Sequence, residues 1–148
     1  MAKLMFSSIL VICTGNICRS PTGERLLRHT LPEMKVDSAG TFGLSGQPAD
    51  ATAMEVAAAH GVSLDGHIAR KLTPAMARDY DLILVMEPAH IEQVTAIAPE
   101  VRGKTMLFGQ WAGKKEIPDP YRKSHEAFEH VYGLLEQASK EWAVRLGK

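Results

Sequence analysis

A continuous apolar run that ends in a cysteine constrains the fold of this 148-residue chain more than any other feature. Residues 7–13 contain Ile9-Leu10-Val11-Ile12, followed directly by Cys13. Such an unbroken run is typical of a parallel strand that is buried on both faces. A short stretch with one glycine follows, and Ser20-Pro21 then offers a hydroxyl cap and a first-turn proline for a helix. The segment therefore predicts a strand, a short loop and a helix in succession.

Strand-like and helix-like segments alternate along the rest of the chain. Further strands are expected at residues 35–39, 81–86 and 104–107, and residues 109–121 are expected to be irregular. Helices are expected from residue 20 to Pro32, at 51–60, from residue 73, at 88–98, and near the C-terminus. This alternation predicts a single α/β domain over residues 1–148, a four-stranded parallel sheet with helices on both faces. In such folds the ligand lies beyond the carboxyl ends of the strands, where Cys13 falls.

Charge and cysteine content narrow the class of partner. Lys+Arg and Asp+Glu both number 17, so the formal charge is zero. Nucleic acids and anionic membranes favour a strong basic excess, so neither is expected as the main partner. The chain has only two cysteines, which favours a reducing cytoplasm over a secreted disulfide scaffold. No apolar run in the sequence approaches the length of a membrane span.

The loop from Cys13 to Arg19 has the groups needed to attack a small oxyanion. The thiolate is the nucleophilic form of cysteine, and both a helix N-terminus and a neighbouring arginine favour it. The amides of residues 14–19 can form an anion nest, and Gly15 is expected to supply a positive φ for its curl. Arg19 can bind two phosphoryl oxygens in a planar fork. The loop after the first strand is therefore expected to bind phosphate.

A Cys-x5-Arg match is weak by itself. The alternative is a buried core cysteine at a strand end, with Arg19 at the surface. The strand before Cys13, the internal glycine and the helix start after Arg19 favour the phosphate site. Other phosphate motifs are absent from the sequence, because no Walker lysine follows the glycine and no Gly-x-Gly-x-x-Gly occurs.

The stretch from Cys13 to Pro21 resembles the signature of the low-molecular-weight protein tyrosine phosphatases, and Asp119-Pro120-Tyr121 resembles their second signature. The likeness covers essentially the whole chain. Residues 103–109 and 117–124 look like the bacterial Wzb-type branch, which acts with tyrosine autokinases in capsule and exopolysaccharide export. The resemblance implies a cytoplasmic hydrolase of phosphotyrosine that works through a phosphocysteine intermediate, with no metal or cofactor. Its implied partner is a phosphotyrosine protein, such as the tyrosine-rich tail of a membrane autokinase.

Asp119 lies between Pro118 and Pro120, which limit where its carboxylate points. From the residues alone, a catalytic acid and a simple Asp-Pro turn both remain open. The resemblance favours an acid that protonates the leaving phenolate and then activates water to hydrolyse the phosphocysteine. Ser20 is expected to hydrogen-bond the sulfur and assist its departure, although a plain helix cap is the alternative. The catalytic residues are thus expected to be Cys13, Arg19 and Asp119.

The resemblance also implies supporting residues. Asn16 tolerates left-handed backbone geometry and is expected to brace the loop, with Ser38 and His67 holding its side chain. Cys18 is expected to form a reversible disulfide with Cys13, the alternative being a small buried hydrophobe. The expected substrate-binding residues are Thr14, Gly15, Asn16, Ile17, Cys18, Ser20, Leu44 and Tyr121. The other histidines match no motif and are expected at the surface: His29, His60, His90, His125 and His130.

The rim of the site departs from many eukaryotic members of the family. Leu44 stands where they have a large aromatic residue, and Arg122 where they have a second tyrosine. The rim is therefore less aromatic, although Phe42 can partly compensate, and eukaryotic substrate preferences do not transfer. A deep slot still favours phosphotyrosine, because phosphoserine would not reach its floor.

Three other functions fit the same loop less well. An arsenate reductase of this fold needs further cysteines downstream, and none occurs after Cys18. A phosphotyrosine-binding module needs neither a thiolate nor an acid. A phosphocysteine carrier in sugar transport would not need Asp119.

Overall fold

The computed structural model describes residues 6–112 and 116–147. Residues 113–115 of the stretch expected to be irregular lie outside the described residues, as do both ends of the expected 1–148 domain. The described chain forms, in order, β1 (Ser8–Cys13), α1 (Arg19–Thr30), β2 (Lys35–Gly40), α2 (Ala51–Ala59), α3 (Pro74–Arg78), β3 (Leu82–Val85), α4 (Pro88–Ile97), a 3₁₀-helix (Pro99–Lys104), β4 (Thr105–Leu107) and α5 (His125–Gly147).

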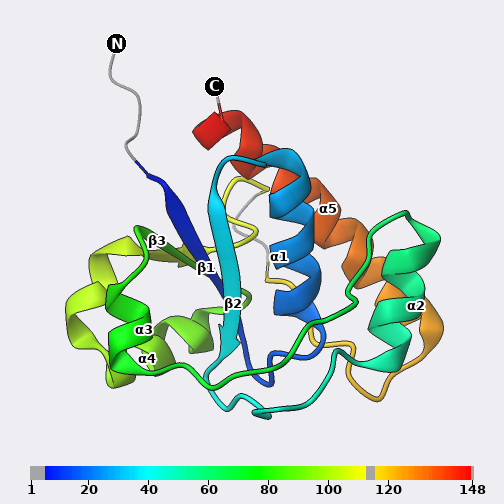
Figure 1. Ribbon diagram of the computed structural model, residues 1–148, viewed down its shortest axis with the longest axis horizontal. Coiled ribbons are helices and arrows are strands. Elements are labelled where there is room, and N and C mark those ends of the chain that lie inside the picture. The colour runs from blue at the N-terminus through cyan, green and yellow to red at the C-terminus, as the bar shows by residue number, and fades with distance from the viewer. Residues whose placement is uncertain (1–5, 113–115, 148) are drawn as a thin grey trace.

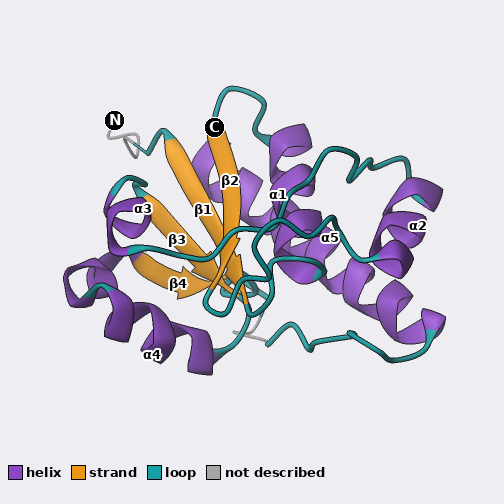
Figure 2. Ribbon diagram, turned by 60° about the horizontal axis from the view of Figure 1, so that its bottom comes forward, coloured by secondary structure: helices purple, strands orange, loops and turns teal. Residues whose placement is uncertain are grey.

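The four strands form one parallel sheet in the order β2-β1-β3-β4 (Figure 2). This arrangement confirms the predicted α/β fold. The connection after β1 leads to β2 on one side of the sheet, and the connection after β3 leads to β4 on the other side. A crevice forms at such a reversal, between β1 and β3. Cys13 is the last residue of β1 and pairs with Gly40, the last residue of β2. The nucleophile candidate therefore lies at the carboxyl edge of the sheet.

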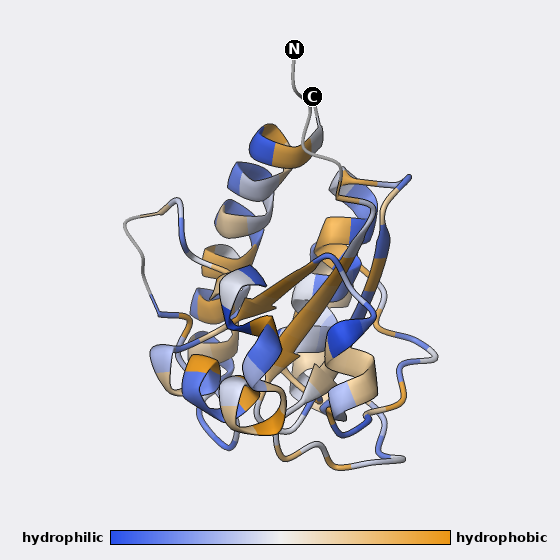
Figure 3. Cartoon of the chain, turned by 90° about the vertical axis from the view of Figure 1, so that its left-hand side faces the viewer, coloured by the Kyte–Doolittle hydropathy of each residue, from blue (hydrophilic) through white to orange (hydrophobic). Residues whose placement is uncertain are grey.

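Each face of the sheet has its own hydrophobic core. Alternate residues of β1 point to opposite faces, so Ile9 and Val11 join one core while Leu10 and Ile12 join the other. The first core lies under α1, α2 and α5, and the second lies under α3 and α4 (Figure 1). The central strands are apolar along most of their length (Figure 3). Burial on both faces explains why the run at residues 9–12 is continuous rather than alternating.

Helix α1 begins one residue earlier than the sequence suggested, and Ser20 is not its cap. Cys18 holds the N-cap position without a side-chain hydrogen bond to the helix. Ser20 lies inside the first turn, where its hydroxyl is directed to the site described below. Other helices do have side-chain caps, because Asp50 accepts from two amides of α2 and Thr73 accepts from one amide of α3. Among the described helices, including the long α5, none is both long and apolar enough to cross a membrane.

Candidate active site

The loop between β1 and α1 is curled by Asn16 rather than by Gly15. Asn16 has a φ of 61°, in the left-handed region, whereas Gly15 is not among the glycines with positive φ. The expected role of Gly15 is therefore wrong. A Cβ on Gly15 would make only ordinary contact with Leu44, 3.6 Å away. Asparagine is one of the few residues that visit left-handed geometry routinely, which is why the loop can turn at this position.

The Asn16 side chain is fixed by hydrogen bonds to three neighbours. Its Oδ1 accepts from the Arg70 backbone N–H at 2.9 Å, so the amide orientation is defined. Its Nδ2 donates to Ser20 Oγ at 2.8 Å and to Ser38 Oγ at 3.0 Å. Ser38 in turn donates to the buried carboxylate of Glu24 at 2.7 Å. The donor and the acceptor of each of these hydrogen bonds are therefore fixed, because the Glu24 carboxylate can only accept and the Arg70 backbone N–H can only donate.

This network directs a hydroxyl proton at the Cys13 sulfur. Ser20 Oγ lies 2.9 Å from Cys13 Sγ, and the Ser20 backbone nitrogen lies 3.4 Å from it. Because Ser20 Oγ already accepts from Asn16, its own proton is free to point to the sulfur. Two donors and the N-terminus of α1 therefore face the sulfur.

His67 contacts Asn16, but not in the way expected. Its Nε2 lies 2.7 Å from the backbone carbonyl oxygen of Asn16, whereas the side chain of Asn16 is held by Ser38 and Arg70. Since a carbonyl only accepts, His67 Nε2 must carry the proton. Burial lowers the pKa of His67, which keeps the ring neutral. His67 thus supports the left-handed turn through the main chain.

Arg19 is buried, and its guanidinium is held by hydrogen bonds to two neighbours. Its Nη1 donates to Glu87 Oε2 at 2.6 Å and to the Ile117 carbonyl oxygen at 2.8 Å. Its Nη2 lies 3.5 Å from Thr14 Oγ1 and 3.7 Å from Asp119 Oδ2. The guanidinium is therefore oriented by its Nη1 side, and its Nη2 side faces the groups that line the pocket.

Asp119 stands at the mouth of the site on a loop that is anchored at its base. Ile117 is buried, and its N–H donates to the Met86 carbonyl oxygen at 2.9 Å. Asp119 Oδ1 accepts from the Tyr121 N–H at 3.0 Å, while Oδ2 faces Arg19. The carboxyl group is half-exposed, so it can exchange protons with solvent and still reach a group bound above Cys13.

One pocket brings most of the predicted residues together. Asn16, Ser20, Ser38 and His67 do not line it and lie in the layer behind the loop. Its rim includes exposed apolar side chains of Phe42, Leu44 and Tyr121. The residues that line the pocket are Cys13, Thr14, Gly15, Ile17, Cys18, Arg19, Phe42, Leu44, Asp119 and Tyr121.

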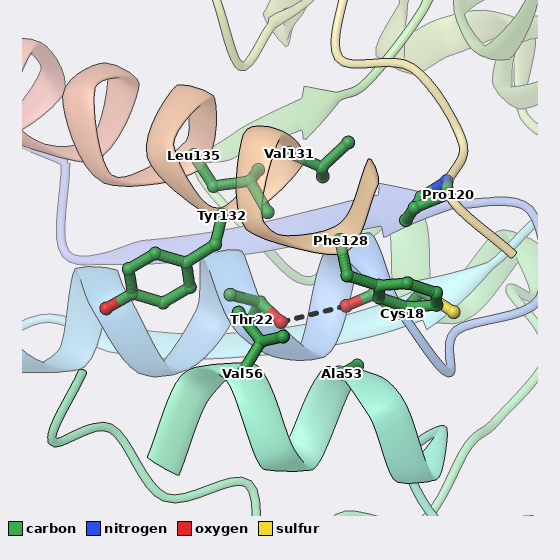
Figure 4. A pocket seen from close by; sticks show the side chains of 9 residues that line it. All are labelled: Cys18, Thr22, Ala53, Val56, Pro120, Phe128, Val131, Tyr132 and Leu135. Carbon is green, nitrogen blue, oxygen red and sulfur yellow. Dashed lines mark hydrogen bonds between the residues drawn. The ribbon is translucent and has the colours of Figure 1, made fainter. Parts of the chain in front are cut away.

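Cys18 lies between this pocket and an apolar cavity. The cavity is enclosed by side chains of α1, α2 and α5 and by Pro120 (Figure 4). The Cys18 carbonyl oxygen accepts from Thr22 Oγ1 at 2.9 Å, as the dashed line in Figure 4 shows. Burial, and then the negative charge of Asp50, raises the pKa of the Cys18 thiol well above its ordinary value. The Cys18 thiol is therefore a weaker nucleophile than an ordinary cysteine.

His90 and Glu87 belong to the site, and neither was among the residues predicted for it. His90 was expected at the surface, but it is 1% exposed, and its Nε2 lies 2.9 Å from Thr14 Oγ1. Glu87 precedes α4 and pairs with Arg19. Both follow β3, the neighbour of β1, at the carboxyl edge of the sheet. Polar residues directly after a predicted central strand were the signal that could have found them.

No metal site is formed by the described residues. In residues 6–112 and 116–147, no three side chains of His, Cys, Asp or Glu gather in a way that could hold a metal ion.

Comparison with known proteins agrees with this geometry. Residues 8–148 match the family "Low molecular weight phosphotyrosine protein phosphatase". The chain belongs to this family and is a protein-tyrosine phosphatase.

Particular relatives are similar along their whole length. The low molecular weight protein-tyrosine-phosphatase Etp of Escherichia coli strain K12 is 74% identical over 148 residues, covering 100% of both chains. The crystal structure of the tyrosine phosphatase Wzb from Escherichia coli K30, in complex with sulphate, has a TM-score of 0.95 and 64% identity, covering 97% of this chain and 100% of that chain. Wzb of Vibrio vulnificus, in complex with benzylphosphonate, has a TM-score of 0.94 and 56% identity, covering 95% and 99%.

Proposed function

We propose that the chain hydrolyses phosphotyrosine in two steps through a phosphocysteine at Cys13. In the first step the Cys13 thiolate attacks phosphorus, an S–P bond forms, and the bond from phosphorus to the phenolic oxygen breaks. Arg19 and the loop amides bind the phosphoryl oxygens, and Asp119 gives its proton to the leaving oxygen. The convergence of Cys13, Arg19 and Asp119 on one pocket is the observation that carries this proposal.

The second step restores the enzyme. The Asp119 carboxylate takes a proton from water, the water oxygen attacks phosphorus, and the S–P bond breaks to give inorganic phosphate and the thiolate. Ser20 stabilises the departing sulfur, because its hydroxyl already lies 2.9 Å from Sγ and its oxygen is occupied by Asn16. Asp119 therefore ends the cycle protonated and ready for the next substrate.

The pocket favours an aryl phosphate over an alkyl phosphate. Cys13 is 2% exposed, so the phosphorus must reach deep below the rim. The exposed side chains of Phe42, Leu44 and Tyr121 offer apolar walls to an aromatic ring at the mouth. The benzylphosphonate bound by the Vibrio vulnificus relative has such a ring next to its phosphorus group, which supports this substrate class.

The physiological substrate that we propose is the phosphorylated, tyrosine-rich tail of a membrane tyrosine autokinase in exopolysaccharide or capsule production. The support is the similarity of residues 103–109 and 117–124 to the Wzb-type branch, together with the full-length similarity to Wzb. We propose that the reaction takes place in the cytoplasm, because a nucleophilic thiol at Cys13 is favoured by a reducing compartment.

Cys18 is proposed to protect Cys13 from irreversible oxidation through a reversible disulfide. Both cysteines are free thiols on the same loop, and both line the pocket. Oxidation of the Cys13 thiolate by a peroxide gives a sulfenic acid, and attack by Cys18 sulfur then forms the S–S bond and releases water. A dithiol reductant restores both thiols.

A leaving-group comparison tests the reaction. Wild type, Cys13→Ser, Asp119→Ala and the exposed control Asp65→Ala are assayed on p-nitrophenyl phosphate and on phenyl phosphate. Cys13→Ser should lose turnover, and Asp119→Ala should lose more activity on phenyl phosphate, whose leaving group needs the proton more. Equal losses on the two substrates would remove Asp119 as the acid, and undiminished turnover by Cys13→Ser would remove the nucleophile.

A further inference from the structure

His90 reaches the phosphate-binding loop from a different part of the sheet. It lies in α4, directly beyond β3, and is 1% exposed. Its Nε2 lies 2.9 Å from Thr14 Oγ1, whereas its buried Nδ1 has no hydrogen-bond partner among the described residues. Three charged groups interact electrostatically with the His90 ring. They are Arg19 in α1, Glu87 just before α4, and Asp119 in the loop that precedes α5.

The directions of the hydrogen bonds at Thr14 can be worked out from these contacts. Burial, and next the positive charge of Arg19, lowers the pKa of His90 to about 4, so the ring is neutral and carries one proton. If that proton were on Nδ1, a buried N–H would have no partner. If it is on Nε2, the ring donates to Thr14 Oγ1 and only an acceptor is left unpaired, which native proteins tolerate more readily. The contacts therefore favour the Nε2–H tautomer.

The Thr14 hydroxyl proton then cannot point to His90 or to Arg19, because both of these groups donate to the Thr14 oxygen. Its oxygen accepts from His90 and is 3.5 Å from Arg19 Nη2, which can also only donate. Since Thr14 lines the pocket, its O–H can point into the space above Cys13. A group that binds there must offer an acceptor, and an ionised phosphoryl oxygen is the strongest one available to it.

We propose that His90 is a positioning residue that turns the Thr14 hydroxyl into a hydrogen-bond donor for a phosphoryl oxygen, beside Arg19. Thr14 is then a binding residue through its side chain as well as its amide. The inference rests on the proposed function, because it assigns the pocket to a phosphomonoester. The shared ligand chemistry is a tetrahedral phosphoryl dianion, so inorganic phosphate is a sufficient probe and no turnover is needed.

A double-mutant cycle with phosphate as the ligand tests the proposal. The dissociation constant of inorganic phosphate is measured by calorimetry for wild type, Thr14→Val, His90→Leu and the double variant. Loss of one hydrogen bond to a charged group should weaken binding roughly tenfold to a hundredfold in each single variant. The double variant should bind no more weakly than Thr14→Val, because His90 acts through the Thr14 hydroxyl.

A conservative variant separates this role from simple packing. His90→Gln retains a donor near the position of Nε2 and should bind phosphate within about threefold of wild type. His130→Leu, an exposed position on α5, is the matched control and should not change the affinity. Thermal unfolding of each variant shows whether it is folded. If His90→Leu does not fold, Thr14→Val still tests the hydrogen bond to phosphate, because this substitution barely changes the side-chain volume.

The outcomes separate this inference from the proposed function. If His90→Leu weakens phosphate binding equally in the wild-type and Thr14→Val backgrounds, His90 does not act through Thr14 and the inference is wrong. Unchanged affinity in both Thr14→Val and His90→Leu also overturns it, with the proposed function intact. Failure of the wild type to bind phosphate at all would contradict the proposed site itself.

Discussion

A Cβ on Gly40 would stand 2.3 Å from the carbonyl oxygen of Thr14. It would also stand 3.0 Å from the backbone nitrogen of Asn16. Gly40 ends β2 directly beside Cys13, so the first turn of the phosphate-binding loop rests on the main chain of the neighbouring strand. The position of Cys13, the proposed nucleophile, therefore depends on the absence of a side chain at Gly40 in the neighbouring strand.

Gly40→Ala should consequently displace the loop and damage both activity and stability. The contact is with backbone atoms, which cannot move aside as a flexible side chain would, and such overpacking costs about 1–3 kcal/mol of unfolding free energy. We expect kcat/KM for an aryl phosphate to fall by roughly a hundredfold, since misplacement by about 1 Å is enough for such a loss. Gly103→Ala is the control, because a Cβ there would meet nothing within 4 Å. Wild-type kinetics in Gly40→Ala would contradict this account of the loop.

Ser20→Ala should slow the second chemical step more than the first. Its hydroxyl proton is directed at Cys13 Sγ, so its loss withdraws stabilisation from the sulfur as the S–P bond breaks. Removing one such donor typically lowers the rate by a factor of about 10² or more. Stopped-flow assays on p-nitrophenyl phosphate should then show a burst of p-nitrophenol followed by slow turnover. Ser63→Ala, on an exposed loop, should behave as wild type, and a variant of Ser20 without a burst would count against the assignment.

The buried His90 should make the folded state less stable in mild acid. The unfolded chain takes up a proton near the ordinary pKa of 6.5, whereas folded His90 does so only near its lowered pKa of about 4. The contribution of His90 to the unfolding free energy is therefore fully present above pH 6.5, and it is lost as the pH falls from there toward 4. Between about pH 7.5 and about pH 5 this single group accounts for a loss of about 2 kcal/mol.

Urea unfolding of wild type and His90→Gln at these two pH values isolates that contribution. All other groups titrate alike in the two proteins, so the loss on acidification should be smaller in His90→Gln by about 2 kcal/mol. His130→Gln, at an exposed position, should show the same acid loss as wild type. If wild type and His90→Gln lose equal stability, His90 is not held neutral by its surroundings.

Leu44→Ala should affect the recognition of the substrate ring but not of the phosphoryl group. Leu44 lines the pocket at its rim and is 46% exposed, so a bound aromatic ring would cover it. Losing that contact should raise KM for phosphotyrosine by roughly fivefold, with the inhibition constant of inorganic phosphate unchanged. Ile68→Ala is the control, because Ile68 is exposed and does not line the pocket. An equal change in both constants would show that Leu44 acts on the loop instead.

Local patterns were enough to predict the sheet and the central part of the site. The apolar runs placed the four strands, and the Cys13 loop placed Arg19 at the start of α1, since these features depend on neighbours in the chain. Asp119 needed the family resemblance, because an Asp-Pro turn has the same local pattern.

The remaining features depend on contacts between distant elements. Glu87 and His90 reach the site only because β3 lies beside β1. Their position directly after a predicted strand marks them as candidates, but the pairing of β3 with β1 depends on residues far apart in the chain. The role expected of Gly15 was assigned to the residue type most tolerant of positive φ, yet the bend falls on Asn16, whose side chain has partners on α1 and β2. The sequence leaves two roles open for Ser20, a helix cap or a hydrogen-bond partner of the Cys13 sulfur. The position of Asn16, which donates to Ser20 Oγ, decides between them.

The central claim is that phosphate passes through Cys13, and rapid acid quenching with mass spectrometry tests it most directly. Wild type is mixed with p-nitrophenyl phosphate, quenched within one turnover, and digested. The account predicts one phosphoryl group on the peptide that contains Cys13, more of it in Ser20→Ala, and none in Cys13→Ser together with lost turnover. Turnover at the wild-type rate by Cys13→Ser, or a phosphoryl group found on another residue, would contradict it.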